Sequence, residues 1–133
     1  MAQLTVGDVI AERTLHLTRE SLVRYAGASG DFNPIHYRDD VAAAVGLPGV
    51  LAHGMLTMGL ASSVVLSALP AGTRVIDYGV RFTKPVVVDA ESGADVHVVA
   101  KVGAVDEEAA RIDLTVKAAE ATVLVKAQLR IAL

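Results

Sequence analysis

The second half of the chain alternates between apolar and polar residues. The pattern covers four segments, at residues 76–83, 95–102, 111–118 and 122–131. Their apolar positions are Ile76, Tyr78, Val80 and Phe82; Val96, Val98, Ala100 and Val102; Ile112, Leu114, Val116 and Ala118; and Val123, Val125, Ala127, Leu129 and Ile131. Because successive side chains of a strand point to opposite faces, the pattern predicts antiparallel strands with one dry face and one wet face.

The connections between these strands differ in how well they specify a turn. Asp106-Glu107-Glu108 is a polar segment typical of a turn. Residues 119–121, Ala-Glu-Ala, contain neither Gly nor Asn, so the last hairpin is weakly specified.

The first half of the chain predicts a strand and two helices. Residues 13–17 alternate and indicate a short strand. Thr18 is suited to cap a following helix, which Gly27 or Gly30 would end. A second, short helix is expected over residues 41–45.

Residues 50–69 are apolar on almost every side of a predicted helix. Their length resembles a membrane span, but His53, Thr57 and Ser62 interrupt them and no basic anchors flank them. A helix that is apolar all round is buried in the protein core. The sequence therefore predicts an α+β domain, in which a five-stranded antiparallel sheet wraps around a long buried helix.

Composition places the chain among small globular domains. With 133 residues, 53% of them apolar, it is expected to form a single domain over residues 1–133. Cysteine is absent, which fits a reducing compartment, and residues 1–20 have no apolar run typical of a signal peptide. We therefore expect a cytoplasmic protein. The net charge of −3, without a basic stripe, argues against nucleic acid as a partner.

An acid, an amide and an imidazole lie close together in residues 29–36. Asp31, Asn33 and His36 surround Pro34, which restricts the backbone and favours an ordered extended loop. A carboxylate and an imidazole held in this way can act together as general acid and base on one water or substrate atom. Spacing alone also allows a structural loop, in which Asp31 caps a turn and His36 begins a helix.

The start of the long apolar segment offers a second chemical feature. Gly54 lacks a side chain, so its backbone N–H can be approached closely at the positive end of a helix dipole. Such an N–H can stabilise a developing oxyanion. His16 and His97 fall on the polar phase of their strands and are expected to be surface residues.

These residues resemble the MaoC-like, or hydratase-2, family of hot-dog proteins. The resemblance lies in three motifs and in Gly46, in the family's order and spacing, and extends from about residue 5 to the end of the chain. The motifs are Tyr25-Ala26-Gly27, Asp31-x-Asn33-Pro34-x-His36, and Ala52-His53-Gly54-Met55-Leu56. Within the family, the pattern is similar to the catalytic B subunits of actinobacterial (3R)-hydroxyacyl-ACP dehydratases, with Phe32 in place of Leu.

The resemblance implies reversible syn addition of water to a trans-2-enoyl thioester, giving the (R)-3-hydroxyacyl product. Asp31 and His36 would hold the reacting water and exchange protons with it and with the α carbon. The Gly54 N–H would bind the thioester oxyanion. Asn33 would hold the loop, and Ser62 would either support Asp31 or bond its own helix backbone.

The resemblance also carries expectations about cofactors, about the substrate and about the oligomeric state. No cofactor and no metal are expected, and the substrate would be an acyl-CoA or an acyl-ACP. An alternative is a noncatalytic acyl-thioester binding or structural hot-dog subunit, which would need neither Asp31 nor His36. A hot-dog thioesterase would usually place a carboxylate on the long helix, and residues 50–69 have none. We expect a homodimer, or a heterodimer with another hot-dog subunit.

Overall fold

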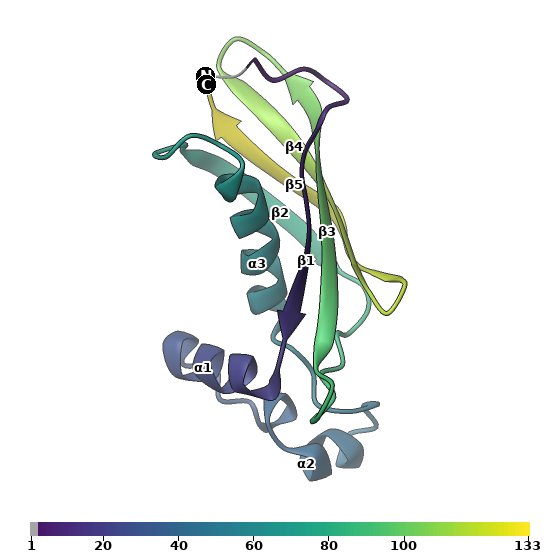
Figure 1. Cartoon of the computed structure of the whole chain (residues 1–133). Helices are drawn as coiled ribbons and strands as arrows, with labels where there is room; N and C mark the ends of the chain where they lie inside the picture. The colour runs from purple at the N-terminus through teal and green to yellow at the C-terminus, as the bar shows by residue number, and fades with distance from the viewer. Residues whose placement is uncertain (1–2) are drawn as a thin grey trace.

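A five-stranded antiparallel sheet forms the larger part of the molecule. The structure is a computed structural model that describes residues 3–133. The elements are β1 (Val9–Leu17), α1 (Arg19–Ser29), the short 3₁₀ helix η1 (Pro34–His36), α2 (Asp39–Ala44), α3 (Gly54–Ser67), β2 (Val75–Phe82), β3 (Ala94–Val105), β4 (Ala109–Ala118) and β5 (Ala121–Ala132). The strands lie in the order β1-β3-β4-β5-β2, so β1 and β2 form the two edges (Figure 1). The predicted α+β class and hot-dog architecture are confirmed.

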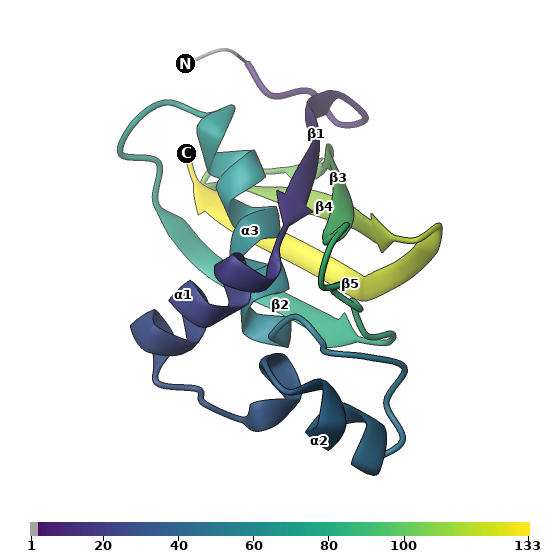
Figure 2. The same cartoon turned by 60° about the horizontal axis from the view of Figure 1, so that its bottom comes forward.

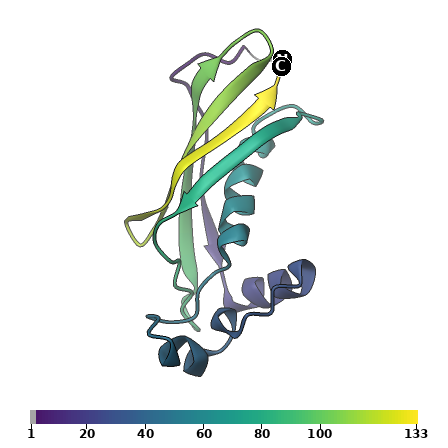
Figure 3. The ribbon, with the colours of Figure 1, turned by 180° about the vertical axis from the view of Figure 1, so that it is seen from behind.

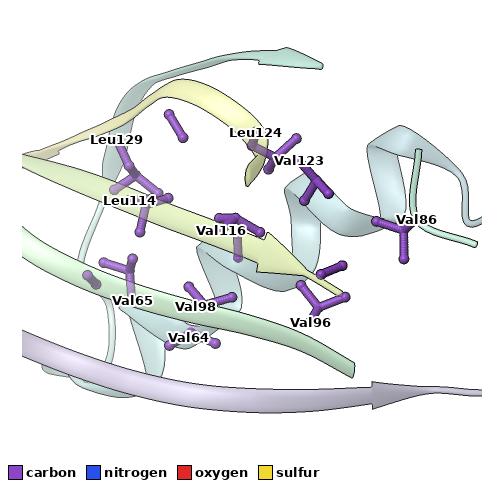
Figure 4. Packing of buried hydrophobic residues seen from close by; sticks show 14 of the residues in the cluster. Val64, Val65, Val86, Val96, Val98, Leu114, Val116, Val123, Leu124 and Leu129 are labelled. Carbon is purple, nitrogen blue, oxygen red and sulfur yellow. The ribbon is translucent and has the colours of Figure 1, made fainter. Parts of the chain in front are cut away.

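The sheet curves around α3, which packs against its concave face (Figure 2). Val64 and Val65 of α3 are buried and face the inward side chains of the central strands (Figure 4). These include Val96, Val98, Ile112, Leu114, Val116 and Leu129, which are 0–7% exposed. The alternation that predicted β3 and β4 therefore follows from one face of the sheet covering the core.

In two places the inward face differs from the prediction. A bulge at Lys126, whose φ is 49°, shifts the phase of β5, so Leu124 is buried and Val125 is half-buried. On the edge strand β2, Ile76 and Phe82 are 46% and 53% exposed. Tyr78 and Val80, in the middle of the strand, pack against the core, so the exposed apolar side chains lie near the two ends of β2. Figure 3 shows β2 at the edge of the sheet, next to β5.

The long helix is shorter and less buried than the sequence predicts. It begins at Gly54 and ends at Ser67, and residues 50–53 are extended, with a bridge between Leu51 and Val87. Only one side of α3 is buried, whereas Met55 and Leu66 are 59% and 37% exposed. The prediction of a helix buried on all sides is therefore wrong for the single chain. Among residues 3–133, no helix is long and apolar enough to cross a membrane.

The helices α1, η1 and α2 cover one end of the sheet and carry the loop of interest. Thr18 caps α1 through a capping box with Ser21, and Gly30 ends it with a φ of 78°. Arg19 ties this end together, because its guanidinium contacts both carboxylate oxygens of Asp39 and the carbonyl of Val88. This contact holds the start of α2 against α1 and the segment that precedes β3.

Candidate active site

The loop after α1 is ordered by its own side chains. The Asp31 carboxylate accepts the backbone N–H of Asn33 at 3.1 Å, and the Asn33 amide oxygen accepts the N–H of Ile35 at 3.3 Å. Asn33 thereby caps η1, in which Pro34 occupies the first turn. Asn33 makes the contacts that a loop-holding residue requires, and the Asp31 carboxylate is fixed on one side.

His36 lies at the end of η1 and faces Asp31. Its Nδ1 donates to the carbonyl of Leu51 at 2.7 Å, because a carbonyl oxygen can only accept. This bond assigns the ring proton to Nδ1 and leaves Nε2 with a free lone pair. Nε2 lies 3.9 Å from the Asp31 carboxylate, a separation at which one water can contact both groups. The His36 side chain is 11% exposed and that of Asp31 is 52% exposed, so the pair borders solvent.

His53 lies directly beneath the pair. It is 1% exposed, and its ring stacks on that of His36 with centroids 3.8 Å apart and planes 22° apart. The Tyr25 ring meets it edge-on at 4.7 Å. Its Nε2 donates to the backbone carbonyl of Asp31 at 3.2 Å. Burial lowers the pKa of His53, with a further contribution from the neighbouring His36.

Gly54 begins α3 beside these residues. As the first residue of the helix, its N–H has no acceptor within the helix and is available to an anion. A Cβ at this position would lie 2.9 Å from the Phe82 ring, so the absence of a side chain keeps the approach open. The N-terminal end of α3 is thus suited to stabilise negative charge.

A cavity of about 330 Å³ connects His36 with Gly54. Its walls come from the start of α3, from residues 82–86 and from β5, and they are mostly apolar. The lining residues are His36, Leu51, Ala52, Gly54, Thr57, Phe82, Thr83, Lys84, Pro85, Val86, Val123 and Leu124. An imidazole that lines an apolar cavity, with a carboxylate 3.9 Å away, suits a substrate with an apolar chain and a reactive polar head.

Three other polar residues named in the sequence analysis lie outside the Asp31–His36 contact. Ser62 donates to the carbonyl of Gly59 at 2.8 Å, which is the helix-backbone alternative, so the structure shows no bond from Ser62 to Asp31. His16 and His97 lie on the outer face, where His16 contacts Asp95 and His97 contacts Glu12.

Asp31, His36 and His53 also form a cluster whose potential ligand atoms lie within 4.8 Å of one another. The stacked rings of His36 and His53 direct their in-plane lone pairs side by side instead of toward one point. Tetrahedral zinc coordination needs lone pairs that converge. This arrangement is therefore better suited to proton transfer than to metal binding.

The sequence motifs correspond to a known family model, described as the MaoC like domain, which matches residues 2–122. The chain belongs to the MaoC-like family. A relative of 39% identity over 79 residues is the 3-hydroxyacyl-thioester dehydratase X of Mycobacterium tuberculosis, covering 59% of this chain and 27% of that protein. The mitochondrial 3-hydroxyacyl-[acyl-carrier-protein] dehydratase of Arabidopsis thaliana is 32% identical over 88 residues, covering 66% and 52%.

Solved structures give the same family and fold. A MaoC-like dehydratase superposes with a TM-score of 0.90 at 35% identity, over 97% of this chain and 40% of that one. The R-hydratase PhaJ1 of Pseudomonas aeruginosa, in its unliganded form, gives a TM-score of 0.83 at 30% identity, over 98% of this chain and 82% of that one. The chain spans between about a quarter and a half of the length of the two dehydratases named first.

Proposed function

We propose that this chain is an (R)-specific enoyl-thioester hydratase, acting reversibly as a (3R)-hydroxyacyl-thioester dehydratase. The observation that carries the proposal is the placement of His36 Nε2 opposite the Asp31 carboxylate at 3.9 Å, at the mouth of an apolar cavity that Gly54 also lines. Each of these groups has a distinct task in adding water to a conjugated double bond.

In hydration, a water between Asp31 and His36 attacks the β carbon of the enoyl chain. The dyad takes a proton from this water as the water oxygen bonds to the β carbon, and the same proton then passes to the α carbon, so both protein groups return to their starting states. With the two groups 3.9 Å apart, the water oxygen and the transferred proton would reach the bound chain from the same side, so addition would be syn. In dehydration the same groups exchange roles.

Negative charge develops on the thioester oxygen while the β carbon is attacked. The Gly54 N–H, at the start of α3, is the donor that would stabilise it. A single donor of this kind contributes roughly 3 kcal/mol to lowering the barrier. The acyl chain would lie along the apolar wall formed by residues such as Val86, Val123 and Leu124.

The names of the relatives support this reaction class. Two are named as dehydratases of 3-hydroxyacyl thioesters, and the (R)-specific enoyl-CoA hydratase of Rhodospirillum rubrum is 32% identical over 71 residues. A noncatalytic binding or structural subunit is the alternative. It is less well supported, because such a subunit would not require the tautomer of His36 to be fixed toward Asp31.

We propose that the working unit is a dimer, formed either by two copies of this chain or by this chain and another hot-dog subunit. The observations that favour it are the exposed apolar side chains on α3 and on the edge strand β2, which a second hot-dog domain would cover. The cytoplasmic location expected from the sequence stays a prediction.

The direct test is an activity assay of the purified chain. Short and long trans-2-enoyl thioesters, on both CoA and acyl carrier protein, are incubated with the protein while the enoyl absorbance is followed. Loss of absorbance with formation of the (R)-3-hydroxyacyl product supports the proposal. Tight binding of the thioesters without turnover would favour the noncatalytic alternative.

A further inference from the structure

His53 contacts both members of the proposed dyad. Its Nε2 donates to the main-chain carbonyl of Asp31 at 3.2 Å, and its ring lies against the face of His36 at 3.8 Å. His53 occupies the N-cap position of α3, but the structure shows no capping bond from its side chain to the helix.

The hydrogen-bond pattern defines the state of this buried ring. The Asp31 carbonyl can only accept, so Nε2 of His53 carries a proton. Nδ1 is buried and, within residues 3–133, has no hydrogen-bond partner. Protonation there would leave an unpaired buried donor on a charged ring, which is costly. The lowered pKa that burial produces agrees with a neutral ring.

The two contacts restrain two different motions of the dyad. The hydrogen bond from His36 to Leu51 lies in the imidazole plane and still permits the His36 ring to tilt about it. The face of His53 opposes this tilt. On the other side, the bond to the Asp31 carbonyl holds the main chain that carries the carboxylate. A neutral neighbour also avoids like-charge repulsion when His36 carries a proton during turnover.

We infer that His53 is a positioning residue, which sets Asp31 and His36 relative to each other through one hydrogen bond and one ring stack. The inference rests on the proposed function, since positioning matters only if the dyad reacts. It differs from a packing role because the two contacts act on different partners, and each can be removed by itself.

Two variants separate the contacts. His53→Phe keeps a ring against His36 and removes the donor to Asp31. His53→Gln keeps an N–H donor and removes the ring face. Each is expected to lower kcat about ten- to a hundredfold with KM changed less than about threefold, because small displacements of reacting groups cost rate more than binding. His97→Phe on the outer face is the matched control, with kcat unchanged.

A double variant tests whether the hydrogen bond acts through Asp31. When Asp31→Asn has already removed the carboxylate, adding His53→Phe is expected to lower kcat less than about threefold further. A merely structural His53 would cost the same factor in both backgrounds, which would overturn the inference. Melting curves of all variants confirm folding, and His53→Leu, which also lacks the donor, serves if His53→Phe does not fold.

A measurement without substrate tests the contact itself. In ¹⁵N NMR of the imidazole nitrogens at pH 7, His53 is expected to be neutral with its proton on Nε2. A proton on Nδ1 at this pH would overturn the inference. A wild-type chain inactive on every thioester would overturn the proposed function, whereas an active wild type with a fully active His53→Phe variant would overturn only the role of His53.

Discussion

His36 Nδ1 donates to the carbonyl of Leu51 at 2.7 Å, and this single bond determines which nitrogen of the ring keeps a free lone pair toward Asp31. Leu51 lies in the extended segment just before α3, where it also bridges to Val87. The segment therefore fixes the tautomer of His36 and leads into the helix end that presents the Gly54 N–H. The proposed acid-base group and the proposed oxyanion donor are therefore held by one stretch of backbone, residues 51–54.

Removing either member of the dyad is expected to abolish most of the turnover. Asp31→Asn and His36→Ala should each lower kcat by about a hundredfold or more, the usual contribution of a general acid or base. The Asp31 side chain is 52% exposed, so its substitution by Asn should leave the melting temperature close to that of the wild type. Steady-state kinetics on an enoyl thioester, together with thermal melting, checks both statements.

The control for this prediction is a pair on the outer face, His16 and Asp95, whose side chains lie 2.7 Å apart. Asp95→Asn removes a carboxylate next to a histidine, neither of which lines the cavity, and should leave kcat unchanged. Near-normal turnover in a folded Asp31→Asn or His36→Ala protein would contradict the dyad.

A side chain at Gly54 is expected to block the oxyanion position. In Gly54→Val the barrier should rise by roughly 3 kcal/mol, the typical contribution of one such donor. Because the new Cβ would also meet the Phe82 ring at 2.9 Å, the double variant with Phe82→Ala relieves that clash. Rates that stay low in the double variant support the oxyanion role. Normal turnover in Gly54→Val, or its full recovery on adding Phe82→Ala, would rule it out.

Much of the fold could be predicted because one face of the sheet is buried. The alternation of β3 and β4 matches the burial of Val96, Val98 and Ile112. The exposure of Ile76 and Phe82 could not be predicted, since alternation shows which residues share a face and does not show that β2 is an edge strand. The same limit applies to the bulge at Lys126, which no Gly or Pro in the sequence marks.

In the site, contacts between sequence neighbours could be predicted, whereas contacts between residues far apart in the sequence could not. The order of the loop follows from neighbours in sequence, because Asp31 and Asn33 bond amides two residues away. The contacts of His36 with Leu51 and of His53 with Asp31 join residues 15 and 22 positions apart, and one partner in each is a backbone carbonyl. Backbone carbonyls carry no residue-type signal, so only the structure could show these bonds. Phe82, which lines the cavity, has the strand pattern of an ordinary core residue.

Stability at high pH is expected to depend on Tyr78. Its hydroxyl donates to the carbonyl of Met58 on α3 at 2.7 Å, and burial raises its pKa to about 12. In the unfolded chain the Tyr78 hydroxyl has its ordinary pKa of 10.0. The stabilisation from keeping this hydroxyl neutral is therefore complete below pH 10 and is lost as the pH rises toward 12. Urea unfolding between pH 9 and 11 should show a smaller loss of stability in Tyr78→Phe than in the wild type.

The same variant tests the hydrogen bond at neutral pH. Tyr78→Phe should lower the free energy of unfolding at pH 7 by about 1 kcal/mol, the net value of a typical buried hydrogen bond. Tyr37→Phe, whose side chain is 44% exposed, is the control and should retain the pH dependence of the wild type. If the free energy of unfolding depended on pH in the same way in Tyr78→Phe and in the wild type, burial would not raise the pKa of Tyr78.

Assembly through the open edge of the sheet is the remaining prediction. β2 pairs with β5 alone, and Ile76 on this strand is 46% exposed. Met55 and Leu66 on α3 are also exposed, although a helix without charged residues is normally covered. A second hot-dog domain beside β2 would continue the sheet and cover these side chains together. Light scattering of the chain purified alone should therefore give twice its mass of 13.8 kDa, if the partner is a second copy.

A charge on the edge strand should weaken this association. Ile76→Lys places a lysine on β2, and lysines on edge strands oppose pairing with another chain. We expect the dissociation constant to rise about tenfold or more, the effect of about 1.4 kcal/mol. Thr115→Lys adds the same charge at an exposed position on the central strand β4 and should leave the dimer intact. A wild-type chain that is monomeric and fully active would contradict the prediction, whereas a monomer that becomes active only with another hot-dog subunit would identify the heterodimer as the working unit.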